Sequence, residues 1–225
     1  MRFYIALFSL LFATSSHALD LSSLSNQDAS GGLKDALIQG VGSAVGKLGA
    51  VDGFLGNPKV KIPLPDSLKK IEKGMKMFGM GKQSDELITR MNRAAEAAVP
   101  EAKTLFVDAV KKMSVADAKA ILTGGDDSAT QYFKKTTSAP LAEKFLPIVK
   151  DATAKVQLAE QYNKYAEMGA KFGLVKKDQA NLEQYVTNKA LDGLYTMMAE
   201  EEKNIRKNPL GASADLIKKV FGALK

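Results

Sequence analysis

Apolar residues recur every three or four positions along almost the whole chain after residue 25. This spacing places them on one face of an α-helix, whereas a half-buried strand needs strict alternation of apolar and polar residues, which is nearly absent. The first such stripe consists of Leu33, Leu37, Val41, Ala44, Val45 and Leu48. We therefore expect an all-α protein, folded as a compact multi-helix bundle.

Four glycines interrupt this first helical stripe, namely Gly40, Gly42, Gly46 and Gly49. Glycine lowers helix propensity, so these positions weaken the helix if nothing compensates. Alternatively, the missing side chains allow a second helix to approach closely. The sequence leaves both interpretations open.

Residues 52–65 read DGFLGNPKVKIPLP and form the least helical part of the chain. Three prolines and two glycines forbid a continuous helix, and only residues 60–62 suit a short extended piece. Because this segment also carries several apolar side chains, we expect it to lie over the helical core. It is then either a structural strap or a lid.

Helical patterns resume at about residue 66. Ser84 is expected to cap a helix, and Pro100 to begin the next one after a sharp turn. Ser114 and Asp117 match a capping box, in which a hydroxyl and an acid each accept a backbone hydrogen bond at a helix start.

In the last third of the chain, a long helical pattern runs from Leu141 to near Gly173. Asp178 is expected to open the last long helix, which Asn208 and Pro209 should close. Ser213 then begins a short amphipathic helix, which either docks on the core or lies on an anionic membrane surface.

The first residues, MRFYIALFSLLFATSSHA, have the three parts of a secretory signal peptide: a basic start, an apolar run and small residues before the cleavage site. We expect residues 1–18 to be cleaved and residues 19–225 to form a single helical domain. The protein is then periplasmic, or secreted if the host has no outer membrane. No later stretch is apolar for long enough to be a transmembrane helix.

Residue types exclude several chemistries. The chain has no cysteine or tryptophan, and its one histidine, His17, lies in the expected signal peptide. Without these side chains, Ser-His-Asp and Cys-His mechanisms and typical zinc sites are excluded. We expect no metal and no cofactor. The formal net charge of +7 is modest and spread along the chain, so nucleic acid is not expected as a partner.

Gly124-Gly-Asp-Asp127 resembles at first sight the metal-binding hairpin of nucleotide cyclases. The flanking patterns are helical on both sides, and the next residue is Ser128, so the structural context of those enzymes is missing. A glycine that ends one helix and an acid that caps the next explain the motif better.

Six polar side chains are candidates for binding an anionic or amphipathic ligand: Asn92, Arg93, Glu96, Thr130, Tyr132 and Arg206. Asn92 and Glu96 are four residues apart on one helix face, so with Arg93 they can hold an anionic head group, or else form ion pairs between helices. Thr130 and Tyr132 lie on the helix after the GGDD motif. Arg206 is four residues from Glu202, a spacing typical of a solvated ion pair, and a functional role requires it to turn inward.

Several strings in the chain are similar to a known bacterial family. They are LSNQDASGGLKDALIQGV, DGFLGNPKVKIPLP, MNRAAEAAVPEA, DAKAILTGGDDSATQYF and KALDGLYTMMAEEEKNIRKNP. On these strings the chain resembles the exported family named domain of unknown function 4197. The resemblance implies a compact, mostly helical, exported protein, and it supplies no activity and no catalytic residues.

The missing catalytic residue types favour a non-catalytic binding protein of the cell envelope. Its ligand is expected to be an apolar or amphipathic small molecule or an envelope protein. Two alternatives remain open: a hydrolase or lyase that uses the carboxylates of Asp126, Asp127 or Glu96, and a purely structural envelope protein.

Overall fold

The computed structural model describes residues 26–69, 81–154, 157–171, 173 and 175–208. The expected signal peptide and residues 209–225 lie outside this range. Within it, the all-α prediction is confirmed, because the described residues form helices and loops without a strand. The α-helices are α1 (Asn26–Gly49), α3 (Gly81–Ala98), α4 (Ala102–Lys112), α5 (Val115–Thr123), α6 (Ser128–Thr153), α7 (Gln157–Lys171) and α8 (Leu182–Lys207).

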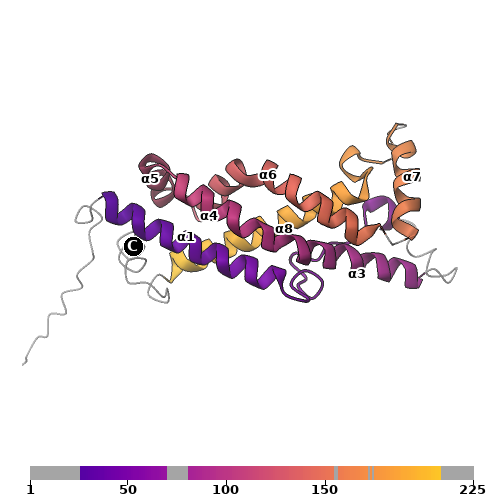
Figure 1. Ribbon diagram of the computed structural model, residues 1–225, viewed down its shortest axis with the longest axis horizontal. Helices are drawn as coiled ribbons and strands as arrows, with labels where there is room; N and C mark the ends of the chain where they lie inside the picture. Colours follow the sequence, from indigo (N-terminus) through magenta and orange to yellow (C-terminus); the bar gives the residue numbers. More distant parts are fainter. Residues whose placement is uncertain (1–25, 70–80, 155–156, 172, 174, 209–225) are drawn as a thin grey trace, which may run out of the picture.

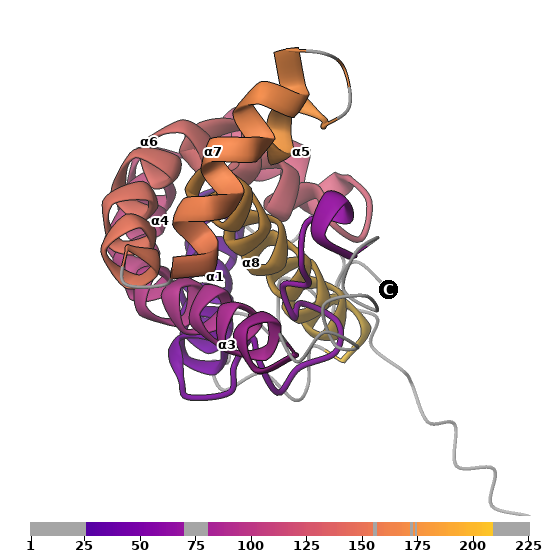
Figure 2. The ribbon, with the colours of Figure 1, turned by 90° about the vertical axis from the view of Figure 1, so that its right-hand side faces the viewer.

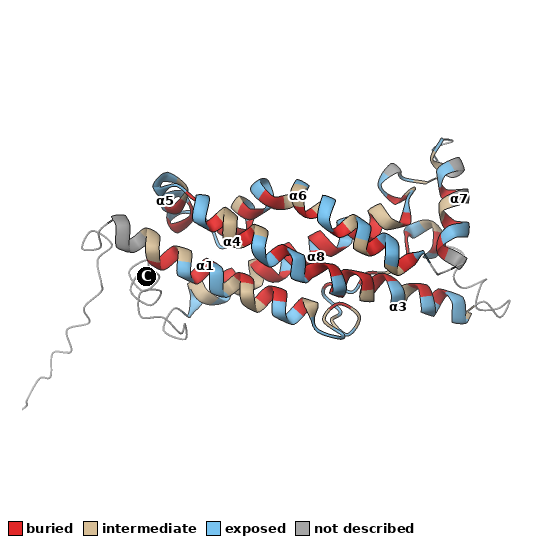
Figure 3. Cartoon of the chain, in the orientation of Figure 1, coloured by how far each residue is buried: buried red, intermediate tan, exposed pale blue. Residues whose placement is uncertain are grey.

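The helices form an elongated bundle around α8. Helices α1, α3, α4, α6 and α8 run along the long axis, while α5 lies at one end and α7 crosses the other (Figure 1). Viewed along that axis, α1, α3 and α6 lie beside α8 (Figure 2), and each of them packs against it. Helix α8 is accordingly the most buried element, and the outer faces of the other helices are exposed (Figure 3).

One apolar core runs through the bundle. Its largest fully buried side chains include Phe54, Phe106, Phe133 and Phe145. The rings of Phe106 and Phe133 meet edge to face at 5.1 Å between centroids, and Phe106 also packs edge to face on Tyr195 of α8. These contacts join α4, α6 and α8, which come from distant parts of the sequence.

Residues 52–65 cross the core as a non-helical strap, as the prolines and glycines predict. Phe54 is completely buried against α8, where a Cβ atom on Gly193 would lie 2.6 Å from the Phe54 ring. Gly193 therefore provides the space into which the strap inserts its aromatic side chain. Tyr185 of the same helix donates a hydrogen bond to the Pro63 carbonyl at 3.0 Å.

Gly42 and Gly46 of α1 do not receive a second helix at close range. A Cβ atom on Gly42 or Gly46 would meet nothing within 4 Å, and one on Gly40 would lie 3.7 Å from Ile205. Only Gly49 is in tight contact, with the Pro100 ring. The close-approach interpretation therefore fails for Gly42 and Gly46.

Helix boundaries differ from the prediction where tertiary contacts decide them. Helix α3 already begins at Gly81, so Ser84 lies inside it and donates to the Gly81 carbonyl instead of capping. Around Pro100 a short 3₁₀ helix, Val99–Glu101, joins α3 to α4. Backbone angles stay helical on both sides of it, so the chain makes no sharp turn (Figure 1).

Two further boundaries were predicted wrongly. Helix α6 continues unbroken from Ser128 to Thr153 with Pro140 and Pro147 inside it, and α7 is a separate helix. Helix α8 begins after Asn181, whose side chain accepts from the Gln184 N–H, while Asp178 lies in a preceding 3₁₀ turn. The capping box of Ser114 and Asp117 is confirmed.

Candidate functional site

The predicted cluster of Arg93 and Glu96 fastens the strap to α3. Glu96 is 4 % exposed, and its Oε1 accepts hydrogen bonds from the backbone N–H groups of Phe54 and Leu55, both at 3.1 Å. Its Oε2 accepts from Arg93 at 2.6 Å, and Arg93 also donates to Asp52 at 2.8 Å. A buried carboxylate needs such partners, and all of them come from this chain.

The acidic partners of Arg93 also favour its charged form. The hydrogen bond to Glu96, followed by the one to Asp52, raises the pKa of the Arg93 guanidinium above its already high ordinary value. Asp52 itself has a φ of 68°, a left-handed conformation that costs energy in a residue with a side chain. The ion pair with Arg93 helps to hold this turn.

Asn92 binds the middle of the strap in the manner of a neighbouring strand. Its side chain is fully buried, its Oδ1 accepts from the Ile62 N–H at 2.8 Å, and its Nδ2 donates to the Ile62 carbonyl at 2.9 Å. Nδ2 also donates to the Ile88 carbonyl at 2.8 Å. Since Ile62 lies outside any helix, its backbone groups have no helical partner, and Asn92 supplies one.

A second cluster, which the sequence did not predict, is centred on Glu202 of α8. Glu202 is 7 % exposed, and its carboxylate accepts from the N–H groups of Ala129 and Thr130, both at 2.9 Å, and from the Thr130 hydroxyl at 3.0 Å. These are N–H groups of the first turn of α6, which no helical carbonyl can satisfy. Glu202 thus caps α6 from another helix, and its negative charge favours that helix end.

Arg206 turns inward and completes this cluster. Its side chain is 11 % exposed and donates to Glu202 at 2.8 Å and to the Ile121 carbonyl at 2.7 Å, near the end of α5. The prediction of a solvated i,i+4 pair was therefore wrong, because Glu202 continues the buried stripe of Leu194 and Met198. The spacing of four residues from Leu194 to Met198 and from Met198 to Glu202 was the feature of the sequence that could have predicted the burial of Glu202.

The GGDD motif is the turn between α5 and α6, as its flanking patterns predict. Gly124 ends α5, and a Cβ atom there would lie 2.8 Å from the Ala120 carbonyl, so the site requires glycine. Asp127 stands at the N-cap position of α6 but its side chain makes no capping hydrogen bond to the backbone. It accepts from Gln131 instead, because Glu202 already occupies the N–H groups.

The predicted residues do not converge on one cavity. Tyr132 is half-buried and donates to the Ala109 carbonyl of α4 at 3.2 Å. Thr130 and Arg206 line two small crevices beside α8, and neither crevice includes Asn92, Arg93 or Glu96. Thr130 and Arg206 are brought together through Glu202, while the α3 cluster stays with the strap.

A groove of about 440 Å³ lies between α1 and α8, beside the Glu202 cluster. It is lined by Gln39, Gly40, Ser43, Glu201, Asn204, Ile205, Lys207 and Asn208. Amide and hydroxyl groups thus surround an apolar position formed by Gly40 and Ile205. The groove is open, and its volume lies within the range of small-molecule sites.

Next to this groove a second, smaller space lies between α1, α6 and α8. A crevice of about 20 Å³ shares Gly40 and Ile205 with the groove, and Leu37, Phe133 and Met198 also line it. Such a volume holds about one water molecule. The groove therefore adjoins a space that is lined mostly by apolar side chains.

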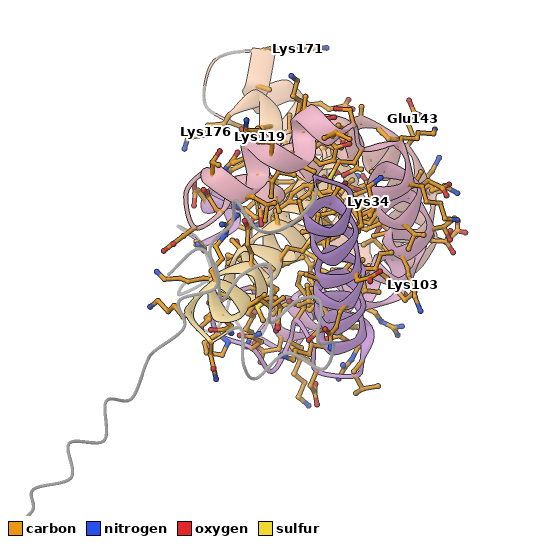
Figure 4. All side chains as sticks on the ribbon, turned by 90° about the vertical axis from the view of Figure 1, so that its left-hand side faces the viewer. Lys34, Lys103, Lys119, Glu143, Lys171 and Lys176 are labelled. Atoms are coloured by element: carbon orange, nitrogen blue, oxygen red, sulfur yellow. The ribbon has the colours of Figure 1, made fainter. Side chains whose placement is uncertain are left out.

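Outside this region the described surface carries mixed charge. The side chains labelled in Figure 4 project outward from several different elements: Lys34, Lys103, Lys119, Glu143, Lys171 and Lys176. Among the described residues, no three histidine, cysteine, aspartate or glutamate side chains gather in a way that would hold a metal ion. None of the described helices is both long and apolar enough to cross a membrane.

Comparison with known proteins identifies the family. The family described as protein of unknown function (DUF4197) matches residues 23–222. No curated protein and no solved structure matches the chain. The family match spans α1 to α8, including the strap, the GGDD turn and both walls of the groove. The chain therefore belongs to the DUF4197 family.

Proposed function

We propose that this protein is an exported, non-catalytic binding protein of the cell envelope, and that the groove between α1 and α8 holds an amphipathic small molecule. The groove itself carries the proposal. Its apolar centre at Gly40 and Ile205 suits an alkyl chain or ring, and the surrounding amides of Gln39, Asn204 and Asn208 suit a polar head.

The contacts of the buried carboxylates support binding over catalysis. Glu96 and Glu202 each accept backbone N–H groups and an arginine, so their oxygens are already engaged. A general acid or base has to reach the substrate proton with an oxygen of its own. This argues against Glu96 as the base of a hydrolase or lyase, while Asp126 and Asp127 belong to an exposed turn.

A matched pair of variants tests the groove. Gly40→Leu places a side chain in the groove, whereas Gly42→Leu places the same side chain about 200° around α1, given 100° per residue. Both changes replace a helical glycine, so their effect on helix propensity is the same. We expect Gly40→Leu to weaken binding of a dansyl-labelled fatty acid by about tenfold and Gly42→Leu to leave it unchanged.

Native mass spectrometry of the protein purified from its own host provides the second measurement. The wild type and Gly42→Leu should retain a bound small molecule, which lipid extraction then identifies, and Gly40→Leu should lose it. Protein that is empty in all three forms and does not bind the dye would favour the structural envelope role. A co-purified protein in place of a small molecule would assign the groove to a protein partner.

A further inference from the structure

The strap begins with an Asp-Gly pair, Asp52 and Gly53, which the turn after α1 imposes. Asp52 has a φ of 68°, a region that aspartate and asparagine enter more readily than most residues. A Cβ atom on Gly53 would lie 2.4 Å from the carbonyl oxygen of Leu48 and 2.5 Å from that of Lys47, so only glycine fits. The close packing of this turn therefore requires the glycine and favours the aspartate before it.

An Asp-Gly pair can rearrange chemically without an enzyme, an oxidant or a cofactor. The backbone nitrogen of the glycine attacks the carboxyl carbon of the aspartate side chain. A C–N bond forms, and the amide proton leaves with the carboxyl OH as water. The five-membered succinimide that results takes up water at either carbonyl and opens to aspartate or to isoaspartate. Glycine favours the attack because it has no side chain to hinder it.

Three contacts oppose this reaction at Asp52. Arg93 donates a hydrogen bond to its Oδ1 at 2.8 Å, and a carboxylate held by a guanidinium repels a nucleophile. The Gly53 N–H donates to the Ala50 carbonyl at 3.0 Å, and the Gly56 N–H donates to the Asp52 carbonyl at 3.0 Å. The two backbone contacts are local to the turn, whereas Arg93 belongs to α3. The carboxyl group is therefore free to react only when it leaves Arg93.

A second Asp-Gly pair, Asp192 and Gly193, lies in the middle of α8 and provides a comparison within the same chain. The side chains of Asp52 and Asp192 are both 60 % exposed, so access of water does not distinguish them. Gly193, however, is buried in the helix interior, where its N–H bonds to the carbonyl four residues earlier. Such an interior opens far less often than a surface turn, so the reaction should favour Asp52.

We propose that Asp52 is a modification site of this protein, where isoaspartate forms in the folded chain, and that Arg93 limits the rate. Isoaspartate carries the main chain through its side-chain carbon, which adds one methylene to the chain at this point. The N–H groups of Phe54 and Leu55 then shift against Glu96, whose buried carboxylate they satisfy. Modification therefore loosens the end of the strap next to α1. The site is separate from the groove, so the proposal does not depend on the proposed function.

Peptide mapping of the aged protein tests the site. The full chain is incubated for several weeks at neutral pH and digested with trypsin. Asp52 then lies in the peptide 48–59 and Asp192 in the peptide 190–203, and neither peptide has a second aspartate. Isoaspartate prevents cleavage of each peptide by endoproteinase Asp-N, which measures its fraction. We expect isoaspartate to accumulate about tenfold faster at Asp52 than at Asp192.

A matched pair of variants tests the role of Arg93. In Arg93→Lys a single ammonium replaces the fork that pairs with both Glu96 and Asp52. We expect isoaspartate to form about tenfold faster at Asp52 and at an unchanged rate at Asp192. Arg90→Lys is the control, because Arg90 lies on the same helix and pairs with a surface glutamate at 3.9 Å. It should leave the rates at both sites unchanged.

Equal accumulation at Asp52 and Asp192 in the wild type would overturn the proposal, because the turn would then have no special reactivity. A faster reaction at both sites in Arg93→Lys would do the same, since it would reflect a loss of the fold. Incubation of the wild type in about 1 M NaCl provides a test without a variant: salt screens the partly exposed pair of Arg93 and Asp52, so Asp52 alone should react faster. A rate at Asp52 that neither the variant nor salt changes would overturn the role of Arg93.

Discussion

At the scale of single residues, Glu96 and Glu202 do the same physical work in different places. Each is a buried carboxylate that accepts hydrogen bonds from two backbone N–H groups. Each is also paired with an arginine of its own helix: Glu96 with Arg93, three residues before it, and Glu202 with Arg206, four residues after it. Buried charge is costly unless it is paired in this way. Both glutamates therefore fix segments that would otherwise leave backbone groups unsatisfied.

Glu202→Gln should lower the free energy of unfolding by about 3 kcal/mol. Glutamine keeps one acceptor oxygen but presents an NH₂ group to the N–H groups of α6, and it leaves the Arg206 charge without its counter-ion. Urea unfolding followed by far-UV circular dichroism measures the change.

Glu200→Gln is the control, since Glu200 is 37 % exposed and pairs with Lys59 at the surface. Its effect should stay within about 0.5 kcal/mol. If both variants lose the same stability, Glu202 does not cap α6.

At the scale of elements, the strap is the part whose position depends most on contacts distant in sequence. Asn92 and Glu96 hold it to α3, while Gly193 and Tyr185 hold it to α8. Every one of these contacts is made by a largely buried group. The strap is thus fastened along its length, which supports the structural interpretation of residues 52–65 over that of a lid.

Tyr185 makes the strap sensitive to high pH. Burial, followed by the charge of Asp66, raises the pKa of Tyr185 to about 12. Because the folded pKa is raised, the contribution to stability is complete below the unfolded pKa of about 10 and is lost as the pH rises through 12. Between those pH values the wild type should lose about 2 to 3 kcal/mol more than Tyr185→Phe, which has no phenol to ionise.

The comparison is made by urea unfolding at several pH values. Tyr185→Phe should start about 1 kcal/mol less stable near neutral pH, since the Pro63 carbonyl loses its donor. All other side chains are the same in both proteins, so the difference between the two curves reports mainly on the Tyr185 phenol. Curves that stay parallel up to pH 12 would contradict the role of the buried phenol.

At the scale of the whole molecule, the bundle is organised by α8. Its buried side chains contact α1, α3 and α6, and they belong to one continuous apolar core. The Glu202 cluster and the strap also attach to this helix. We therefore expect the ends of the bundle to unfold together and not as separate units.

Two single-tryptophan variants test this, since the chain has no tryptophan of its own. Tyr132→Trp reports on the packing of α6 against α4, and Tyr162→Trp reports on α7 near the other end of the bundle. In urea the fluorescence transition of each variant should coincide with the circular dichroism transition of the same variant, as two-state unfolding requires. A fluorescence midpoint of Tyr162→Trp that lies below its own circular dichroism midpoint would mark α7 as an independent unit.

The sequence by itself determined the fold class, the strap and the turn at GGDD. These follow from local rules: apolar spacing sets the helical face, prolines and glycines forbid a helix, and glycine ends one. It also supplied the family resemblance. The three polar residues of α3 were found as a group, because residues three or four apart share a helix face.

Only the tertiary structure decided what those residues contact. Asn92 and Glu96 bind a strap thirty or more residues away in the sequence, and the cap of α6 comes from Glu202 in α8 instead of Asp127 beside it. The groove likewise needs α1 and α8 side by side. Local spacing determines which side of a helix a residue occupies, but the partner on that side depends on how the helices pack. That packing is set jointly by many contacts between residues far apart in the sequence, so no short stretch of sequence predicts it.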